Sequence, residues 1–237
     1  LHVSEASDAA LKTPEVHPKI TLEEPKLSES TLAPTRVSKD LRVCLMVEPC
    51  PLTYVSGYAN RFQELLKHLA AEKDSVEIVS VQLINPKERP KTFLGFPVHY
   101  TGGFQMPNYP KLSISFDWTF KLLRTVLHMR PNLIHVSSPG FMLFGAVFCA
   151  RALQIPLIIS YHTHLPVYVR SYGPRFLGTN RFCEWLSWQL LRMLHSCADQ
   201  TVVTSPQIRD EFVAHGVPRV GVWQKGIDSQ RFHPRFR

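Results

Sequence analysis

Several common sequence signals are absent from this chain. The longest apolar run, residues 141–150, falls well short of the roughly 20 residues that a membrane-spanning helix needs. Neither G-x-G-x-x-G nor G-x-x-x-x-G-K-[ST] occurs, so a dinucleotide fingerprint and a P-loop are unsupported. No D-x-D pair is present to hold a metal against a diphosphate. The sequence therefore predicts no transmembrane helix, and it lacks these three phosphate-binding motifs.

Cysteine is sparse and carries no metal motif. The five cysteines are widely spaced, and no C-x-x-C pair occurs among them. Such a pattern favours buried thiols in a reducing compartment over disulfides or a zinc site.

Aromatic residues are missing from the first forty positions. Residues 1–40 hold four prolines and many Ser and Thr, but no Phe, Tyr or Trp, and we expect them to form a disordered tail or linker. Acidic residues outnumber basic ones there, although the whole chain carries a net charge of +8. The positively charged remainder suits an anionic partner: nucleic acid, an anionic membrane surface or a phosphorylated small molecule.

Residues 41–224 alternate apolar runs of strand length with amphipathic helical segments. We expect strands at 42–47, 76–81, 97–100, 133–136, 155–161, 200–203 and 220–223, and helices at 58–73, 116–129, 139–153, 180–196 and 206–216. This alternation predicts an α/β fold with a doubly wound parallel sheet, in the manner of a Rossmann-like domain.

Two features refine the expected helices. Ser138-Pro139 and Ser205-Pro206 each resemble an N-cap residue followed by proline at the first helical position. In the helix at 180–196, helical spacing predicts an apolar face made of Phe182, Trp185, Leu186, Leu190 and Met193.

The ends of the sequence suggest a larger protein. Residue 1 is Leu, so a targeting peptide could precede it. Residues 225–237 are rich in turn-forming and basic residues, and we expect them to form a hinge to a further, missing domain.

The segment from Ser160 to Tyr168 is the first candidate site. It follows an apolar strand and carries Tyr161, His162 and His164, at the rim of the sheet where open α/β folds bind ligands. A neutral, hydrogen-bonding histidine that faces a ligand is favoured, with a packed structural histidine as the alternative. A metal pair of His162 and His164 is less favoured because no third ligand is recognisable. His135, inside an apolar strand, is expected to be a core histidine.

The loop at residues 51–61 is the second candidate. It lies between the first expected strand and the first expected helix, where backbone N–H groups and the helix dipole attract phosphate. Gly57 would permit a close approach, and an ordinary turn is the alternative interpretation.

A third region, residues 168–188, mixes arginines with aromatic residues. This composition is typical of helices at membrane interfaces. The alternative is that the aromatic side chains are core and the arginines are a solvated face. The arginines are Arg170, Arg175 and Arg181.

Six short stretches of the chain, taken in order, resemble the N-terminal domain of a family 4 glycosyltransferase with the GT-B fold. The matching stretches are VEP at 47–49, YVSGY at 54–58, NRF at 60–62, SSPG at 137–140, SYHTH at 160–164 and KGID at 225–228. The resemblance spans residues 41–237, and within the family it is strongest to the sulfoquinovosyltransferases of photosynthetic organisms.

The resemblance implies a reaction and its surroundings. Sulfoquinovose would pass from UDP-sulfoquinovose to diacylglycerol with retention, at a chloroplast membrane surface, to form sulfolipid; no metal, cofactor or nucleic acid would be involved. Related enzymes that use other sugar donors share several of the stretches. The alternatives are therefore another family 4 sugar or lipid glycosyltransferase, or a non-catalytic membrane- or ligand-binding module.

The resemblance also implies roles for individual residues. The catalytic residue would be His162, through a hydrogen bond to the donor sugar. The donor would further contact Ser56, Gly57, Tyr161, His164, Lys225, Gly226 and Asp228. On the composition of residues 168–188, we expect Arg170, Arg175 and Arg181 on the membrane and acceptor side. Because the family binds its nucleotide chiefly through a second domain, we expect these 237 residues alone to be inactive.

Overall fold

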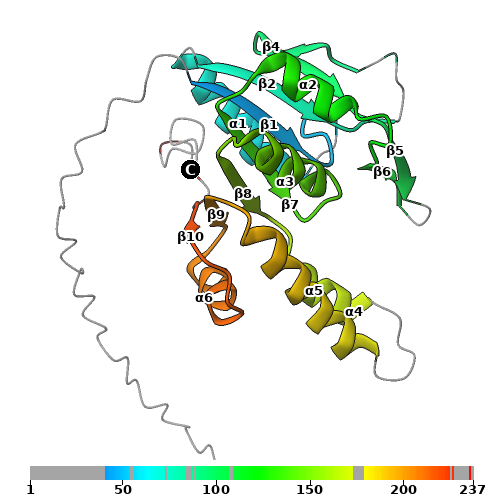
Figure 1. Cartoon of the computed structure of the whole chain (residues 1–237), viewed down its shortest axis with the longest axis vertical. Helices are drawn as coiled ribbons and strands as arrows, with labels where there is room; N and C mark the ends of the chain where they lie inside the picture. The colour runs from blue at the N-terminus through cyan, green and yellow to red at the C-terminus, as the bar shows by residue number, and fades with distance from the viewer. Residues whose placement is uncertain are drawn as a thin grey trace, which may run out of the picture. The chain divides into compact units, whose positions relative to one another are not determined.

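A computed structural model gives the structure of the chain (Figure 1). It describes residues 41–53, 56–72, 74–83, 87, 89–106, 109–172, 179–224, 226 and 235. The expected tail at 1–40 lies outside the described residues. So do Arg175, Lys225 and Asp228, together with most of the expected hinge.

A mostly parallel sheet of eight strands forms the centre of the fold (Figure 1). Its order is β10-β9-β8-β7-β1-β2-β4-β3, and only the β3–β4 pair is antiparallel. The strands are β1 Arg42–Val47, β2 Ser75–Ser80, β3 Thr92–Phe93, β4 Phe96–Tyr100, β7 Leu133–Ser138, β8 Leu157–Tyr161, β9 Gln200–Val203 and β10 Val220–Val222. Strand order reverses at β1, which lies between β2 and β7. The prediction of a doubly wound α/β sheet is confirmed.

Helices cover both faces of this sheet. They are α1 Gly57–Ala71, α2 Lys121–Met129, α3 Met142–Leu153, α4 Leu165–Tyr172, α5 Thr179–His195 and α6 Pro206–Ala214. The side chains of α2, α3 and the end of α5 form one core with the sheet, and those of α1 form another. The central strand β1 is buried from Val43 to Val47, which explains its continuous apolar sequence.

The two serine-proline pairs behave differently. Ser205 caps α6 as predicted, because its Oγ accepts a hydrogen bond from the Ile208 N–H at 3.3 Å. The prediction for Ser138 is wrong: it ends β7, and α3 begins only at Met142. The Ser138 hydroxyl instead lies 3.0 Å from the buried His195 Nε2, so tertiary packing prevails over local capping.

The predicted apolar face of α5 is wrong except at Leu190, which is partly buried and packs against the core. Phe182 and Trp185 are more than half exposed, and their rings stack on each other with centroids 5.8 Å apart. The buried face of α5 consists of Trp188, Leu191 and Leu194. Both sets have helical spacing, so the sequence pattern did not distinguish the stripe that meets the sheet from the one that meets solvent.

A β-hairpin between β4 and α2 was not predicted. Its strands are β5 Gly103–Met106 and β6 Tyr109–Ser115, paired antiparallel. The expected helix at 116–129 begins only at Lys121. The Asp117 carboxylate accepts the Leu122 N–H at 2.5 Å, which satisfies one of the first N–H groups of α2.

We expect Gly103→Ala to lower the free energy of unfolding by about 2 kcal/mol, because overpacking displaces the paired strand. A Cβ at Gly103 would collide with the Ile114 carbonyl oxygen and lie 2.9 Å from Val81 Cγ2. Urea denaturation measures the loss. The matched control is Gly57→Ala, since a Cβ there meets nothing within 4 Å; an equal loss in both variants would contradict the prediction.

Candidate functional site

A cleft of about 730 Å³ lies at the carboxyl edge of the parallel strands. Open α/β folds bind ligands at this edge, where strand order reverses, and the volume is ordinary for a small-molecule site. The lining residues lie at or just after the ends of β1, β7, β8 and β9, or belong to α1 and its N-cap, β6 and α4: Glu48, Pro49, Ser56, Gly57, Tyr58, Arg61, Leu112, Ser137, Ser138, Pro139, His162, Thr163, Tyr168 and Thr204.

The N-terminus of α1 forms one wall of the cleft. Ser56 caps the helix, because its Oγ accepts the Ala59 N–H at 3.1 Å. Gly57 is the first helical residue and leaves open space beside its backbone. Free N–H groups and the helix dipole at such a position favour an anion, and Arg61 adds a positive charge one turn further on.

His162 lies in the wall of the cleft just after β8, beside α1. Its backbone N–H donates to the Ser138 carbonyl at 2.9 Å. Its imidazole packs against Phe62, with ring centroids 5.1 Å apart, and against Trp223 at 5.9 Å. Burial, followed by the nearby charges of Arg61 and His135, lowers the pKa of His162 to about 3. The imidazole is therefore neutral near pH 7.

A buried serine fixes the tautomer of His162. The Ser160 hydroxyl lies 3.3 Å from the Val136 carbonyl oxygen and 3.0 Å from Nε2 of both His135 and His162. Because a carbonyl only accepts, all three hydrogen bonds form together only when the hydroxyl donates to the carbonyl and both imidazoles donate through Nε2. The remaining ring nitrogen of His162, Nδ1, is then an acceptor.

His135 lies behind this wall. Burial lowers its pKa to about 4, and its ring packs on Phe62 and Trp223. These contacts agree with the expected core histidine.

Tyr161 and His164 do not reach the cleft. Tyr161 is fully buried; its hydroxyl accepts the Leu165 N–H at 2.8 Å, and its ring packs on Phe212. His164 Nε2 lies 2.6 Å from a Glu211 carboxylate oxygen on α6. The chain leaves the strand after Tyr161, so the two-residue alternation that would have put His162 and His164 on one side no longer applies. The assignment of a donor contact to Tyr161 is therefore corrected to a packing role.

Glu48 is a cleft residue that the sequence analysis did not single out. Its buried carboxylate accepts the Ser115 N–H at 2.8 Å and the Met142 N–H at 2.6 Å. Burial raises its pKa to about 7, although these backbone hydrogen bonds act to lower the pKa. The only sequence signal was its place in the stretch 47–49, because an isolated glutamate has no spacing pattern.

The two expected membrane residues that the structure describes, Arg170 and Arg181, do not line the cleft. Arg170 on α4 and Arg181 on α5 are both exposed, and Arg170 Nη1 lies 3.6 Å from the Glu184 carboxylate. Helices α4 and α5 lie side by side (Figure 1). Gly226 is exposed. Among the described helices, none is both long and apolar enough to cross a membrane.

No metal cluster of three or more His, Cys, Asp and Glu residues occurs within the part of the chain that the structure describes. His162 and His164 have separate partners, Ser160 and Glu211.

Comparison with known proteins places this geometry in context. Residues 55–231 match Glycosyltransferase Family 4. The sulfoquinovosyl transferase SQD2 of Arabidopsis thaliana is 37% identical over 221 residues, which are 91% of this chain and 41% of that protein. A GDP-mannose-dependent alpha-mannosyltransferase of Mycobacterium tuberculosis is 28% identical over 198 residues, which are 83% of this chain and 50% of that protein. The chain thus spans half or less of the length of these two relatives.

Among solved structures, the chain is similar to a sucrose-phosphate synthase from Thermosynechococcus elongatus. The two are 13% identical, with a TM-score of 0.46, over 82% of this chain and 95% of that one.

Three buried histidines predict that acid destabilises the fold. Burial lowers the pKa of His135 to about 4 and the pKa values of His162 and His195 to about 3. Between pH 6.5 and these values the unfolded chain binds protons that the folded chain does not, so the free energy of unfolding falls as pH falls through this window. Each histidine contributes up to about 1.4 kcal/mol per pH unit. Glu48 opposes this trend. Because its pKa is raised to about 7, the folded chain binds a proton at Glu48 just below pH 7, where the unfolded chain does not.

Urea denaturation between pH 7.5 and pH 5 measures the effect. His162→Asn should reduce the slope by up to about 1.4 kcal/mol per pH unit, whereas His68→Asn, on the exposed face of α1, should not. A pH-independent free energy of unfolding in the unsubstituted protein would contradict the prediction.

Proposed function

Because the chain belongs to glycosyltransferase family 4, we propose that it forms the cleft in which sulfoquinovose passes from UDP-sulfoquinovose to the free hydroxyl of diacylglycerol. The transfer retains the configuration at the anomeric carbon and yields a sulfolipid. The identity of 37% to the Arabidopsis sulfoquinovosyl transferase supports this donor. The similarity to GDP-mannose-dependent enzymes makes GDP-mannose the second donor to assay.

The observation that carries the proposal is that a neutral histidine and the N-terminus of α1 line the same cleft. Gly57 lies at that N-terminus, and His162 follows β8 and packs beside α1. The donor diphosphate would lie against the N–H groups at Gly57, where no side chain blocks its approach. His162 Nδ1 would accept a hydrogen bond from a hydroxyl of the donor sugar.

Charge develops on the diphosphate as the glycosidic bond breaks. Preorganised N–H groups of α1 and the Arg61 guanidinium would stabilise that charge at no cost of reorganisation. The Arg61 side chain is already held, because its Nη1 donates to the Trp223 carbonyl at 2.5 Å.

The proposed domain organisation follows from the same resemblance. Residues 41–224 would form the N-terminal domain, and 225–237 would lead to a second domain that supplies Arg and Lys contacts to the nucleotide. Lys225, Gly226 and Asp228 would approach the donor from this hinge. On this basis the 237 residues alone should transfer no sugar.

The lipid acceptor requires contact with a membrane. Exposed apolar side chains on α5, among them Phe182 and Trp185, lie on the same helix as Arg181. Aromatic side chains combined with arginines suit the boundary of an anionic membrane. Similarity to the Arabidopsis enzyme supports residence at the chloroplast membrane as part of this proposal.

Changing His162→Ala in the whole enzyme should lower kcat/KM for sulfoquinovosyl transfer by about 100-fold, if the imidazole orients the reacting sugar. Steady-state assays with UDP-sulfoquinovose and diacylglycerol measure the loss. His68→Ala, an exposed histidine on α1, is the matched control. Turnover within twofold of the unsubstituted enzyme would reduce His162 to a packing residue.

Replacing Arg170, Arg175 and Arg181 together by Ser should weaken binding to anionic vesicles by about 100-fold, at roughly 1 kcal/mol for each charge near the surface. Vesicle co-sedimentation at constant salt measures binding. The control removes three exposed charges elsewhere, at Lys67, Lys91 and Arg209. Equal binding by the two triple variants would rule out the membrane role of the α4–α5 arginines.

A further inference from the structure

A second cavity, here called the aromatic groove, lies between α2 and α3. Its volume is about 460 Å³, within the range of small-ligand sites. The groove floor includes Leu122, Met142 and Cys149, which belong to the core of the sheet. A Cβ on Gly145 would lie 2.5 Å from Leu122 Cδ2, so the absence of a side chain there lets the two helices lie close together under the groove.

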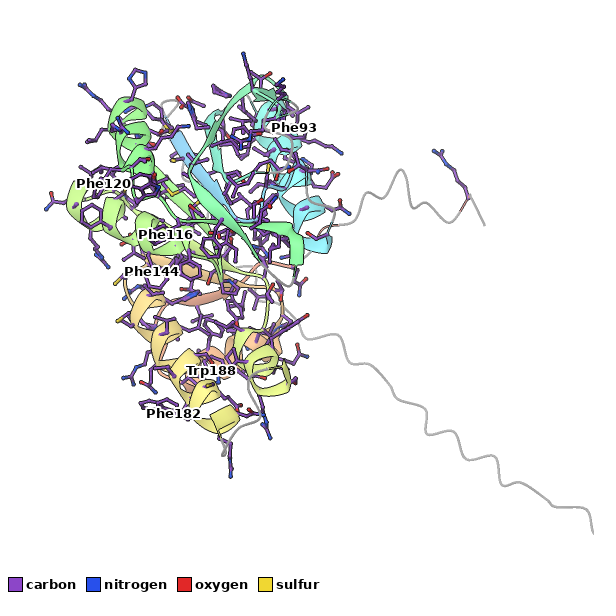
Figure 2. All side chains as sticks on the ribbon, turned by 90° about the vertical axis from the view of Figure 1, so that its right-hand side faces the viewer. Phe93, Phe116, Phe120, Phe144, Phe182 and Trp188 are labelled. Atoms are coloured by element: carbon purple, nitrogen blue, oxygen red, sulfur yellow. The ribbon has the colours of Figure 1, made fainter. Side chains whose placement is uncertain are left out.

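Exposed aromatic side chains surround this groove. They are all between 44% and 76% exposed: Phe116, Trp118, Phe120, Phe141, Phe144 and Phe148. Figure 2 shows Phe116, Phe120 and Phe144 gathered on one side of the protein. Large apolar side chains left in solvent in this number mark a binding surface.

The polar end of the groove adjoins the donor cleft. Ser115 and Met142 line the groove, and their backbone N–H groups both donate to the Glu48 carboxylate, which lines the cleft. One carboxylate therefore separates the apolar groove from the place where the sugar would react. A ligand that fits both cavities has an apolar tail and a polar head.

We propose that the aromatic groove binds one acyl chain of the lipid acceptor and so directs the glycerol hydroxyl toward the cleft. The inference rests on the proposed function for the identity of the lipid. Its geometric basis is that the groove and the cleft adjoin at Glu48. A helix or strand of another protein would not need this adjacency, whereas a diacylglycerol must have its hydroxyl in the cleft and its chains outside it.

Positive charge next to the groove residues in sequence agrees with this occupant. Lys121 and Arg124 lie on the first turns of α2, beside Phe120, and the Arg124 guanidinium donates to the Thr119 carbonyl at 2.9 Å. The Asp117 carboxylate is occupied by the Leu122 N–H and the Thr119 hydroxyl. Apolar rings flanked by cations match the boundary between acyl chains and anionic head groups.

The test measures lipid binding separately from sugar transfer. The purified protein is titrated with a diacylglycerol that carries one fluorescent parinaroyl chain, in neutral detergent micelles. The double variant Phe144→Ser with Phe148→Ser removes two exposed rings of the groove, and we expect its dissociation constant to rise about tenfold. The control, Leu94→Ser with Val213→Ser, removes two comparably exposed apolar side chains, one between β3 and β4 and one on α6, and should leave the dissociation constant unchanged.

Three results would overturn the groove assignment: no change in the groove variant, an equal loss in both variants, or a shift of oligomeric state in the groove variant alone. The last would show that a second copy of the chain covers the groove. Failure of the proposed function can be distinguished from failure of the groove assignment. If the whole, unsubstituted enzyme binds the fluorescent lipid through the groove but transfers no sugar from any donor, the proposed reaction is wrong and the lipid site stands.

Discussion

The buried carboxylate of Glu48 holds together the segments around both cavities. It joins the end of β1 to the end of β6 through the Ser115 N–H and to the start of α3 through the Met142 N–H. The Glu48 backbone N–H in turn donates to the Ser137 hydroxyl at 3.0 Å. Burying a carboxyl group is costly unless its oxygens are hydrogen-bonded. Because the carboxylate accepts N–H groups from both β6 and α3, their displacement would leave polar groups unpaired in the interior.

Much of the fold follows from hydrophobic periodicity, and the failures have local causes. The central strands are buried on both faces, so runs such as residues 42–47 predict them directly. The face of α5 was misassigned because exposed Phe182 and buried Trp188 lie on stripes of equal apolarity. The hairpin at 103–115 was missed because it pairs only with itself, outside the βα alternation that guided the prediction.

The candidate site was predictable where chemistry coincides with a strand end. Ser56, Gly57 and His162 follow such ends, and the structure brings them into one cleft. Tyr161 has the same local sequence context, but the last residue of β8 points into the core. Glu48 and the Ser160 network depend on contacts between segments far apart in sequence, which no local pattern encodes. The neutral, oriented state of His162 arises from that network, because aromatic packing removes water and Ser160 selects the tautomer.

The order of the strands also bears on how the protein acquires its site. The cleft combines Glu48, Gly57, Ser138, His162 and Thr204, so its walls come from segments more than 150 residues apart. Contacts of such long range carry a large loop-closure entropy, and parallel sheets that depend on them fold slowly. A growing chain on the ribosome thus has no complete cleft until β9 has joined β8. Ligand binding at this site would consequently report that β1, β7, β8 and β9, and not only the first part of the sheet, have assembled.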